Sequence, residues 1–317
     1  MATVLVTGNA GFIGSHVVER LLARGDSVVG FDNFDPFYDP AIKRRNLAAV
    51  QGHPRFRFVE GDLRERAQVD ALFSDRQIDR VFHAAARAGV RPSLKDPLLY
   101  EEVNVRGTIH LLEAAVRHRV ANFVFASSSS VYGEQKKLPF SESDSVDNPI
   151  SPYAATKKAG ELICYTYHHL YGLPVTCLRF FTVYGPRQRP EMAIHAFTRA
   201  IARGEALVLY GDGSARRDFT YIDDIVVGVL AALDRVHPYE IINLGESRTI
   251  ELKELILLLE RLLDKRAAIS AHPAQPGDVP VTYADVSKAR ALLDYVPSTS
   301  IEGGLQRFVE WYRMEAA

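Results

Sequence analysis

The chain has 317 residues, of which 47% are hydrophobic and 24% are charged, and its formal net charge is −1. A chain of this length and composition can form two domains, or one large α/β domain with an appended lobe. The balanced charge excludes a broadly basic surface, so we expect neither nucleic acid nor a membrane as a partner.

Cysteine usage and the start of the chain predict a cytoplasmic protein. No apolar run reaches the roughly 18 residues that a membrane-spanning helix needs. Met1 leads directly into an expected strand, without a charged and apolar leader. Cys164 and Cys177 each lie in an apolar pattern, which is typical of core residues rather than of a disulfide or a metal site.

The chain begins with the pattern of a dinucleotide-binding turn. The β-branched run 3–7 predicts a buried parallel strand, and helical spacing of apolar residues follows over 17–22. Between them, Gly8 permits a tight turn, Gly11 lets the backbone approach a pyrophosphate, and Gly14 lets helix and strand pack closely. The residues expected to contact the cofactor in this segment are Gly8, Gly11, Phe12, Ile13 and Gly14.

A second strand, over 27–31, ends at Asp32, which lies 18 residues beyond Gly14 (32 − 14 = 18). A carboxylate at this position accepts hydrogen bonds from the adenosine ribose hydroxyls and repels a 2′-phosphate. The pattern therefore predicts NAD as the cofactor and disfavours NADP.

Strands and helices continue to alternate. Strands are expected over 56–59, 80–83 and 122–126, with helices over 65–73 and 97–117. This alternation predicts an α/β protein with a doubly wound, Rossmann-like parallel sheet, in which ligands lie at the carboxyl ends of the strands. Asp62 at one such end is expected to reach the adenine, and Ala84, Ala85 and Ala86 to lie against the cofactor. His83 is interpreted as a structural residue.

Catalytic residues are expected on a helix that runs from Tyr153 to about Tyr171, where Gly172 ends it. Tyr153 and Lys157 are four residues apart and therefore share one helix face. A phenol has a pKa of about 10. A lysine one turn away favours its ionised form, which can remove a proton from a carbinol. A preceding serine run, 127–130, can supply a hydroxyl to the same oxygen.

The composition changes after Phe180, where prolines and arginines cluster. We predict an NAD-binding domain over 1–180 and a mainly substrate-binding lobe over 181–317, with the segment near 222–243 returning to the first domain. Within the lobe we expect a strand over 206–210 and another over 240–243. Helices are expected over 194–203, 222–234 and 251–263, and from about residue 301.

These motifs together resemble the extended short-chain dehydrogenase/reductase family, and within it the NAD-dependent nucleotide-sugar epimerases. T-G-N-A-G-F-I-G over 7–14, Asp62-Leu63, N-V-R-G-T over 104–108, Y-A-A-T-K over 153–157 and R-D-F over 217–219 all resemble family signatures. The similarity covers essentially the whole chain. It implies Asp62 and Leu63 at the adenine, and it implies an isomerase that inverts C4 of a nucleotide sugar through a transient 4-keto intermediate.

Further segments are most similar to UDP-glucuronate 4-epimerases. These are the loop after the second strand, A-G-V-R over 88–91, R-F-F-T-V-Y-G-P over 179–186, R-P-E-M-A over 189–193 and Q-P-G-D over 275–278. The chain also departs from the usual pattern of these enzymes. Glu191 replaces the usual aspartate, and Ala84, the second residue of H-A-A-A over 83–86, stands where leucine is commoner. The resemblance implies that Asn33 and Lys43 contact the cofactor, and that the UDP-sugar is bound by Arg91, Ser128, Ser129, Thr182, Arg189, Arg217 and Asp278.

The resemblance also separates neighbouring activities. Sugar 4,6-dehydratases carry an Asp-Glu pair where this chain has Ser129 and Ser130, and UDP-glucuronate decarboxylases carry glutamate in place of Ser130. UDP-glucuronate to UDP-galacturonate is therefore the expected reaction, with UDP-glucose 4-epimerase and, less favoured, UDP-glucuronate decarboxylase as alternatives. A non-catalytic NAD-sensing protein is disfavoured because Ser128, Tyr153 and Lys157 are all present. Family members are usually homodimers, and the helices over 97–117 and 153–171 are candidates for that contact.

Overall fold

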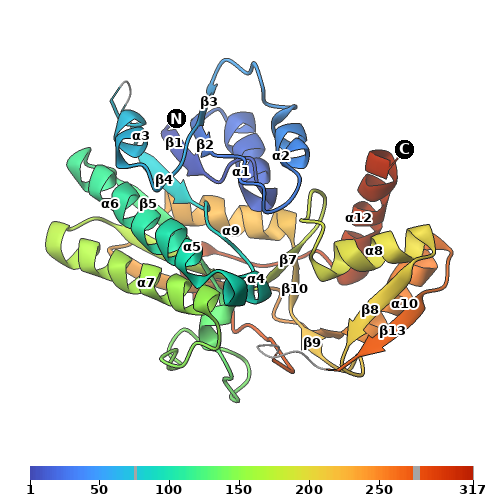
Figure 1. The fold of residues 1–317 in the computed structure, drawn as a ribbon. Coiled ribbons are helices and arrows are strands. Elements are labelled where there is room, and N and C mark those ends of the chain that lie inside the picture. Colours follow the sequence, from blue (N-terminus) through green and yellow to red (C-terminus); the bar gives the residue numbers. More distant parts are fainter. Residues whose placement is uncertain (75–76, 274–278, 317) are drawn as a thin grey trace.

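The computed structural model describes residues 1–74, 77–273 and 279–316 (Figure 1). A seven-stranded parallel sheet with the order β3-β2-β1-β4-β5-β6-β11 lies at its centre. This confirms the predicted doubly wound fold. The inner strands are continuous apolar runs because helices cover both faces of the sheet. The strands are β1 (Thr3–Thr7), β2 (Ser27–Asp32), β3 (Phe56–Glu60), β4 (Arg80–His83), β5 (Asn122–Ser128), β6 (Val175–Phe180) and β11 (Tyr239–Leu244).

Helices cover both faces of the sheet (Figure 1). A separate apolar cluster lies between each face and its helices. Residues such as Val69, Leu111 and Cys164 fill the side under the first helix group, and Val17 and Val229 lie on the opposite side. The second cluster continues into the C-terminal lobe, so burial of apolar surface joins the two parts of the molecule. The first group is α3 (Arg66–Ala71), α6 (Gly107–Arg117) and α7 (Pro152–Tyr171), and the second includes α1 (Phe12–Ala23), α2 (Pro40–Leu47) and α9 (Ile222–Asp234).

The long helix expected over 97–117 is interrupted. It begins as α5 (Pro97–Glu101), passes through a π-helical turn over Glu102–Arg106, and resumes as α6. Asn104 lies in that turn, and its side chain accepts a hydrogen bond from the Arg87 backbone N–H at 2.8 Å and donates to the Arg87 carbonyl at 3.0 Å. It also donates to Thr156 Oγ1 at 3.0 Å. The wider turn therefore lets one side chain join the loop after β4 to helix α7.

Helix α2 was not predicted, because the segment reads as a loop after the second strand. Asp39 caps it by accepting a hydrogen bond from the Ala41 N–H at 2.9 Å, and Pro40 occupies its first position. The short helix α4 (Val90–Lys95) begins after Gly89, whose φ is 99°.

The C-terminal lobe is built on a parallel strand pair, β8 (Ala206–Tyr210) and β13 (Ala268–His272), with helices α8 (Ala193–Arg203) and α10 (Leu252–Leu263) beside it (Figure 1). β8 was expected, whereas β13 was not. α11 (Ser287–Leu293) was also missed, and the chain closes with α12 (Ile301–Ala316).

Two short strand pairs join the lobe to the sheet. β7 (Thr182–Tyr184) runs parallel to β10 (Phe219–Tyr221), and β9 (Arg216–Arg217) is antiparallel to β12 (Ile250–Glu251). Between them, the buried Asp218 carboxylate accepts backbone hydrogen bonds from Glu246 at 2.8 Å, Ser247 at 3.1 Å and Ala284 at 3.1 Å. One acid thus organises the junction, and it supplies the partner that the buried Ala284 N–H needs.

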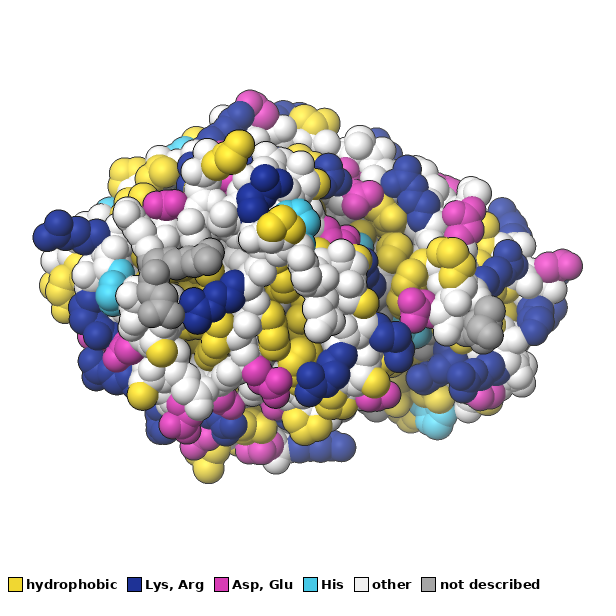
Figure 2. Space-filling view, turned by 90° about the horizontal axis from the view of Figure 1, so that it is seen from above, with side chains coloured by type: hydrophobic (Ala, Val, Ile, Leu, Met, Phe, Trp, Pro, Cys, Tyr) yellow, Lys and Arg dark blue, Asp and Glu magenta, His cyan; other side chains and the backbone are white. Residues whose placement is uncertain are grey.

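Basic and acidic side chains are both scattered over the face in Figure 2, in keeping with the net charge of −1. Within the described ranges, no helix has the length and apolar character to cross a membrane. Cys164 and Cys177 are both buried and free, as expected for core residues.

Candidate active site

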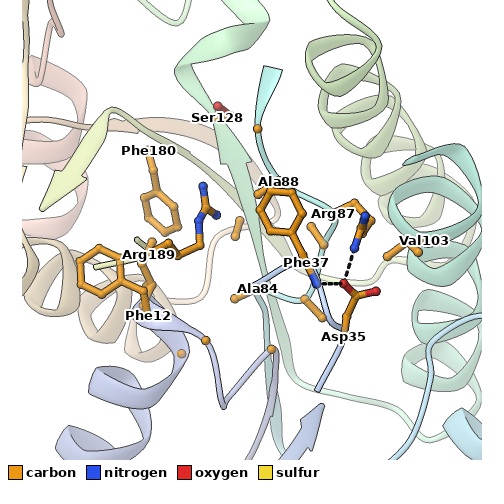
Figure 3. Close-up of a pocket in the computed structure, with 18 of the residues that line it drawn as sticks. Phe12, Asp35, Phe37, Ala84, Arg87, Ala88, Val103, Ser128, Phe180 and Arg189 are labelled. Atoms are coloured by element: carbon orange, nitrogen blue, oxygen red, sulfur yellow. Dashed lines mark hydrogen bonds and ion pairs between the residues drawn. The ribbon is translucent and has the colours of Figure 1, made fainter. Parts of the chain in front are cut away.

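A cavity of about 360 Å³ lies at the carboxyl ends of β1, β2, β4, β5 and β6 (Figure 3). Parallel strands all end at the same edge, so segments far apart in the sequence meet there. Every residue that was predicted to contact the cofactor lines this one cavity. They are Gly8, Gly11, Phe12, Ile13, Gly14, Asp32, Asn33, Lys43, Asp62, Leu63, Ala84, Ala85, Ala86, Tyr153 and Lys157.

The glycine turn forms a cradle that tolerates no side chain. Gly8 has a φ of 70°, and a Cβ added there would lie 2.7 Å from the Ala85 nitrogen. A Cβ on Gly14 would lie 2.2 Å from the Gly8 carbonyl oxygen. Helix α1 starts directly after Gly11, and within the described chain no side chain caps its first amides. These free N–H groups and the positive end of the helix dipole suit a pyrophosphate, so the residues present fit a dinucleotide.

Acidic groups define the side of the cavity that follows β2 and β3. Asp32 is buried and accepts hydrogen bonds from the backbone of Ala10 at 3.2 Å and Phe34 at 2.9 Å. Burial raises its pKa, although the nearby Lys43 ammonium acts in the opposite direction. Asn33 donates to Asp62 at 3.0 Å. Burial also raises the pKa of Asp62, but hydrogen bonds from Arg64 and Asn33 outweigh it and bring the value to about 2.

His83 is a neutral structural residue. Its Nδ1 lies 2.7 Å from the Thr7 hydroxyl and its Nε2 2.9 Å from the Thr108 hydroxyl. Because Thr108 donates to the Asn104 carbonyl at 2.6 Å, it must accept from Nε2–H, which leaves Nδ1 as the acceptor. Complete burial lowers the pKa of His83 to about 3. The histidine therefore connects β1, β4 and α6.

Tyr153, Lys157 and Ser128 converge on the cavity from α7 and the end of β5. Ser151 caps α7 by accepting a hydrogen bond from the Ala154 N–H at 3.1 Å, which sets where the helix starts. The Tyr153 ring packs edge-on against Tyr100, with 6.3 Å between centroids. Lys157 is buried, and its Nζ donates to the Ala126 carbonyl at 2.7 Å. The ammonium is thereby held at the end of β5, beside Ser128.

Burial and nearby groups shift the protonation of Tyr153 and Lys157 in opposite directions. Burial raises the pKa of the Tyr153 phenol, and the described groups that oppose this are the Ser128 hydroxyl, by a hydrogen bond, and the positive charge of Arg189. Burial lowers the pKa of Lys157 to about 8, although Cys164 and Glu161 favour its charged form. The positive charge of Arg189 therefore favours the ionised phenol, an influence that the sequence did not predict.

The predicted substrate residues fall into two groups. Ser128, Ser129, Thr182 and Arg189 line the cavity. Arg91 and Arg217 are not among its lining residues. The Arg91 guanidinium lies 4.5 Å from the centroid of the Tyr210 ring, and Arg217 donates to the Pro280 carbonyl at 3.2 Å. Asp278 and the rest of the 275–278 segment lie outside the described residues.

Sequence reasoning missed part of the lining. Asp35, Phe37, Tyr38 and Arg87 face the cavity, as does Ser130, which the sequence singled out as the place of a glutamate in dehydratases and decarboxylases but not as a binding residue. The missed residues directly follow predicted ones, since they continue the loops that begin at Asp32 and Ala84. Within the described part of the chain, no group of three His, Cys, Asp or Glu residues is placed to hold a metal ion.

The family comparison agrees with this geometry. The family model "NAD dependent epimerase/dehydratase family" matches residues 4–245. A UDP-glucuronate 4-epimerase from Thermodesulfobacterium geofontis is 46% identical over 312 residues, covering 98% of this chain and 96% of the relative.

Two solved structures are also similar. A UDP-glucuronic acid 4-epimerase from Bacillus cereus, in complex with UDP-glucuronic acid and NAD, has a TM-score of 0.94 at 38% identity, with 99% of each chain covered. A UDP-glucose 4-epimerase from Thermotoga maritima, with UDP-glucose, has a TM-score of 0.92 at 33% identity, with 99% of this chain and 100% of that chain covered. The chain therefore belongs to the NAD-dependent epimerase/dehydratase family.

Proposed function

We propose that this protein is an NAD-dependent isomerase that inverts C4 of a UDP-sugar, converting UDP-glucuronate to UDP-galacturonate. The single observation that carries the proposal is one cavity lined by the glycine turn, by Asp32 and by the set Ser128, Tyr153 and Lys157. The similarity over the whole chain to relatives named UDP-glucuronate 4-epimerase supports the choice of sugar.

Tyr153 is the acid and base of the reaction. It removes the proton from the sugar 4-hydroxyl and returns it after C4 has been reduced from the other face. When bound, NAD supplies the acceptor and then the donor of the C4 hydride. The Ser128 hydroxyl, which also donates to Ser130 Oγ at 3.1 Å, holds the 4-oxygen. Lys157 is fixed by the Ala126 carbonyl, and we assign it to the nicotinamide ribose.

Arg189 links substrate recognition to the base. Its guanidinium points into the cavity beside Phe180, opposite Ala88 (Figure 3). We assign it, together with Thr182 and Ser129, to the glucuronate carboxylate, because a charge that enters a closed site must be paired. The same positive charge favours the ionised form of Tyr153.

The remaining assignments follow from position in the cavity or, for Arg91 and Arg217, which do not line it, from the family resemblance. Asp32 and Asn33 are assigned to the adenosine ribose, Asp62 and Leu63 to the adenine, and Lys43 to the wall of the cofactor site. Arg91 and Arg217 are assigned to the UDP end of the substrate, with Arg217 at the diphosphate. On this basis residues 1–180 bind the cofactor, residues 181–317 mainly bind the UDP-sugar, and the segment near 222–243, which holds α9 and most of β11, returns to the first domain.

Product analysis tests the proposal. Incubation with UDP-glucuronate is expected to give UDP-galacturonate, identified by proton NMR of the anomeric signals. Tyr153→Phe is expected to lower kcat by at least about 10²-fold while the protein still binds NAD. A UDP-pentose product would instead identify a decarboxylase. Retention of most turnover by Tyr153→Phe would refute the assigned base.

UDP-glucose 4-epimerase is the second candidate, favoured by the similarity to the Thermotoga maritima enzyme. It needs the same catalytic groups and differs only at C6. Arg189→Ala distinguishes the two, because it should remove activity on UDP-glucuronate while leaving neutral UDP-glucose the better substrate. If Arg189→Ala loses the same fraction of activity on both sugars, Arg189 does not recognise the carboxylate.

We also propose that the protein is a cytoplasmic homodimer. Helix α7 exposes Leu162, Tyr165, Leu170 and Tyr171, and the adjacent α5 exposes 75% of Leu98. A monomer rarely leaves so many large apolar side chains on neighbouring helices in water. Light scattering on the purified protein should give twice the chain mass, and Leu170→Glu with Leu98→Glu should give the monomer mass.

A further inference from the structure

The two loops that flank the cofactor side of the cavity are joined to each other by an ion pair. One loop, residues 33–38, follows β2, and the other, residues 84–89, follows β4. Asp35 and Arg87 face each other across the space between them and form a salt bridge (Figure 3). Only 24% of the Asp35 side chain and 17% of the Arg87 side chain are exposed. Partial burial reduces the screening of such a pair by water and salt.

A ring reinforces this bridge. The Arg87 guanidinium lies 5.0 Å from the centroid of the Phe37 ring, and the Arg189 guanidinium lies 5.9 Å from the same centroid. Phe37 therefore stands between an arginine of the sheet domain and one of the segment that leads to the C-terminal lobe. Its backbone N–H also donates to Asp35 at 2.9 Å (Figure 3). Three segments of the cavity wall thus meet at one side chain.

Both ends of the bridge are anchored. Arg87 is fixed by the two backbone hydrogen bonds to Asn104 in the π-helical turn. On the other side, the Asp35 backbone makes two hydrogen bonds. Its N–H donates to Asn33 Oδ1 at 2.9 Å, and its carbonyl oxygen accepts from Lys43 Nζ at 2.8 Å. Residues on both loops line the cavity, so the pair lies in the wall of the cofactor site and not on a remote surface.

We propose that the Arg87–Asp35 pair, stacked on Phe37, is a clasp that retains NAD through the catalytic cycle. The inference rests on the proposed function, because C4 inversion returns the hydride that was taken from the same sugar. If the reduced nucleotide dissociates between the two half-reactions, the keto sugar cannot be reduced again. One reduced nucleotide then appears in solution for each keto sugar that is left. For glucuronate that keto sugar is a β-keto acid, which loses CO2. Parting the two loops requires the pair to separate.

Dissociation of NAD tests the clasp without any sugar. Protein loaded with radiolabelled NAD is diluted into excess unlabelled NAD, and the label that stays bound is followed in time. Arg87→Gln and Asp35→Asn are each expected to raise the dissociation rate about tenfold. The double variant is expected to match the single variants within about twofold, since either change alone breaks the pair. Reversing the pair with Arg87→Asp and Asp35→Arg is expected to restore much of the retention.

A matched control is Arg235→Gln, which removes the exposed ion pair with Asp294 far from the cavity and should leave NAD dissociation unchanged. Thermal unfolding of each variant shows whether it is folded, and the reversed pair keeps the test decisive if a single variant is not. Dissociation rates within twofold of the parent in both single variants, or additive effects in the double variant, would overturn the clasp.

The sugar reaction gives a separate readout. With UDP-glucuronate and no added NAD, the clasp variants should release reduced nucleotide into solution and stop after fewer turnovers than the parent. If no UDP-sugar is epimerised by the parent but the NAD dissociation rates change as expected, the clasp stands and the proposed function falls. If the parent epimerises and the dissociation rates do not change, only the clasp falls.

Discussion

At the scale of single residues, the face of α7 that carries Tyr153 and Lys157 continues one turn further to Glu161. Glu161 forms a buried ion pair with Arg179. Glu161 accepts hydrogen bonds from Arg179 at 2.8 and 2.9 Å and from the Ser127 hydroxyl at 2.7 Å. Both charged side chains are almost fully buried. Ser127 directly precedes the proposed substrate contact Ser128. The Glu161–Arg179 pair therefore stabilises the end of β5 through the Ser127 hydroxyl.

Neutralising this acid should destabilise the fold. Glu161→Gln leaves Arg179 as an unpaired buried charge, and loss of one partner of such a pair costs about 3–5 kcal/mol. Urea unfolding followed by circular dichroism measures the change. The matched control is Glu101→Gln on the exposed side of α5, which should alter the free energy of unfolding by less than about 0.5 kcal/mol. Similar free energies for both variants would contradict the supporting role.

The base should respond to the charge of Arg189. Because this guanidinium opposes the rise in the pKa of Tyr153 that burial causes, removing it leaves the phenol harder to ionise. In Arg189→Gln the acidic limb of the kcat/KM profile for UDP-glucose should therefore move to higher pH, with activity several-fold lower near neutrality. A neutral sugar is used so that loss of carboxylate binding does not enter the measurement. An unshifted limb would show that Arg189 does not tune the base.

At the scale of elements, the turn between β1 and α1 decides whether the cofactor binds. The helix approaches the strand so closely that a methyl group on Gly14 would lie 2.2 Å from the Gly8 oxygen. Backbone atoms on both sides cannot move aside as a flexible side chain can. The short distance between these two elements is also what leaves the first amides of α1 open for a phosphate.

Gly14→Ala should therefore lose NAD binding and at least about 1–3 kcal/mol of stability, the range for overpacking a tight site. Gly303→Ala is the matched control, because it lies in helix α12 with its nearest neighbour, Ser300 Oγ, at 3.4 Å. There the alanine should stabilise the protein by up to about 1 kcal/mol, since glycine is a poor helix former. Calorimetric titration with NAD and urea unfolding measure both effects, and normal NAD affinity of Gly14→Ala would contradict the expectation.

At the scale of the whole molecule, the junction between sheet and lobe holds acids that resist ionisation. Burial and the charges of Asp224 and Asp218 raise the pKa of Glu246 to about 7, and within the described chain its buried Oε2 has no hydrogen-bond partner. Burial likewise raises the pKa of Asp218 to about 6, although the four hydrogen bonds that its carboxylate accepts act to lower it. By linkage, these raised pKa values favour the folded protein over the unfolded chain most when both acids carry protons.

The sign of the pH dependence follows from linkage. Because the folded-state pKa of Glu246 lies above its ordinary value, its stabilising contribution is complete below that ordinary value and is lost as the pH rises through about 7. Glu246→Gln should remove this loss and stabilise the protein at pH 8 by about 1 kcal/mol, a figure reduced for solvent screening because the side chain is only half buried, while changing little at pH 5. Urea midpoints at the two pH values measure it. If the difference in stability between the parent and Glu246→Gln is the same at pH 5 and pH 8, the raised pKa of Glu246 is contradicted.

The sequence patterns predicted the core architecture and most of the cofactor lining. Strands β1, β2 and β4 are mainly apolar runs, and segments with helical spacing separate most of the strands of the sheet, so the local pattern sufficed. Strand β13 and the π-helical turn were missed for a different reason. β13 is a strand because β8 lies beside it, and the turn widens because Asn104 must reach Arg87 and Thr156, which are distant in sequence.

The sequence by itself determined which chemical groups are available: the glycine turn, Asp32, Ser128 and the pair Tyr153 and Lys157. Those groups stand in short motifs whose spacing alone sets their geometry. Only the tertiary structure brought the Arg189 charge close enough to act on the phenol and paired Arg87 with Asp35. Burial and long-range contact set both, because a pKa or an ion pair depends on the neighbours that folding brings from other parts of the chain.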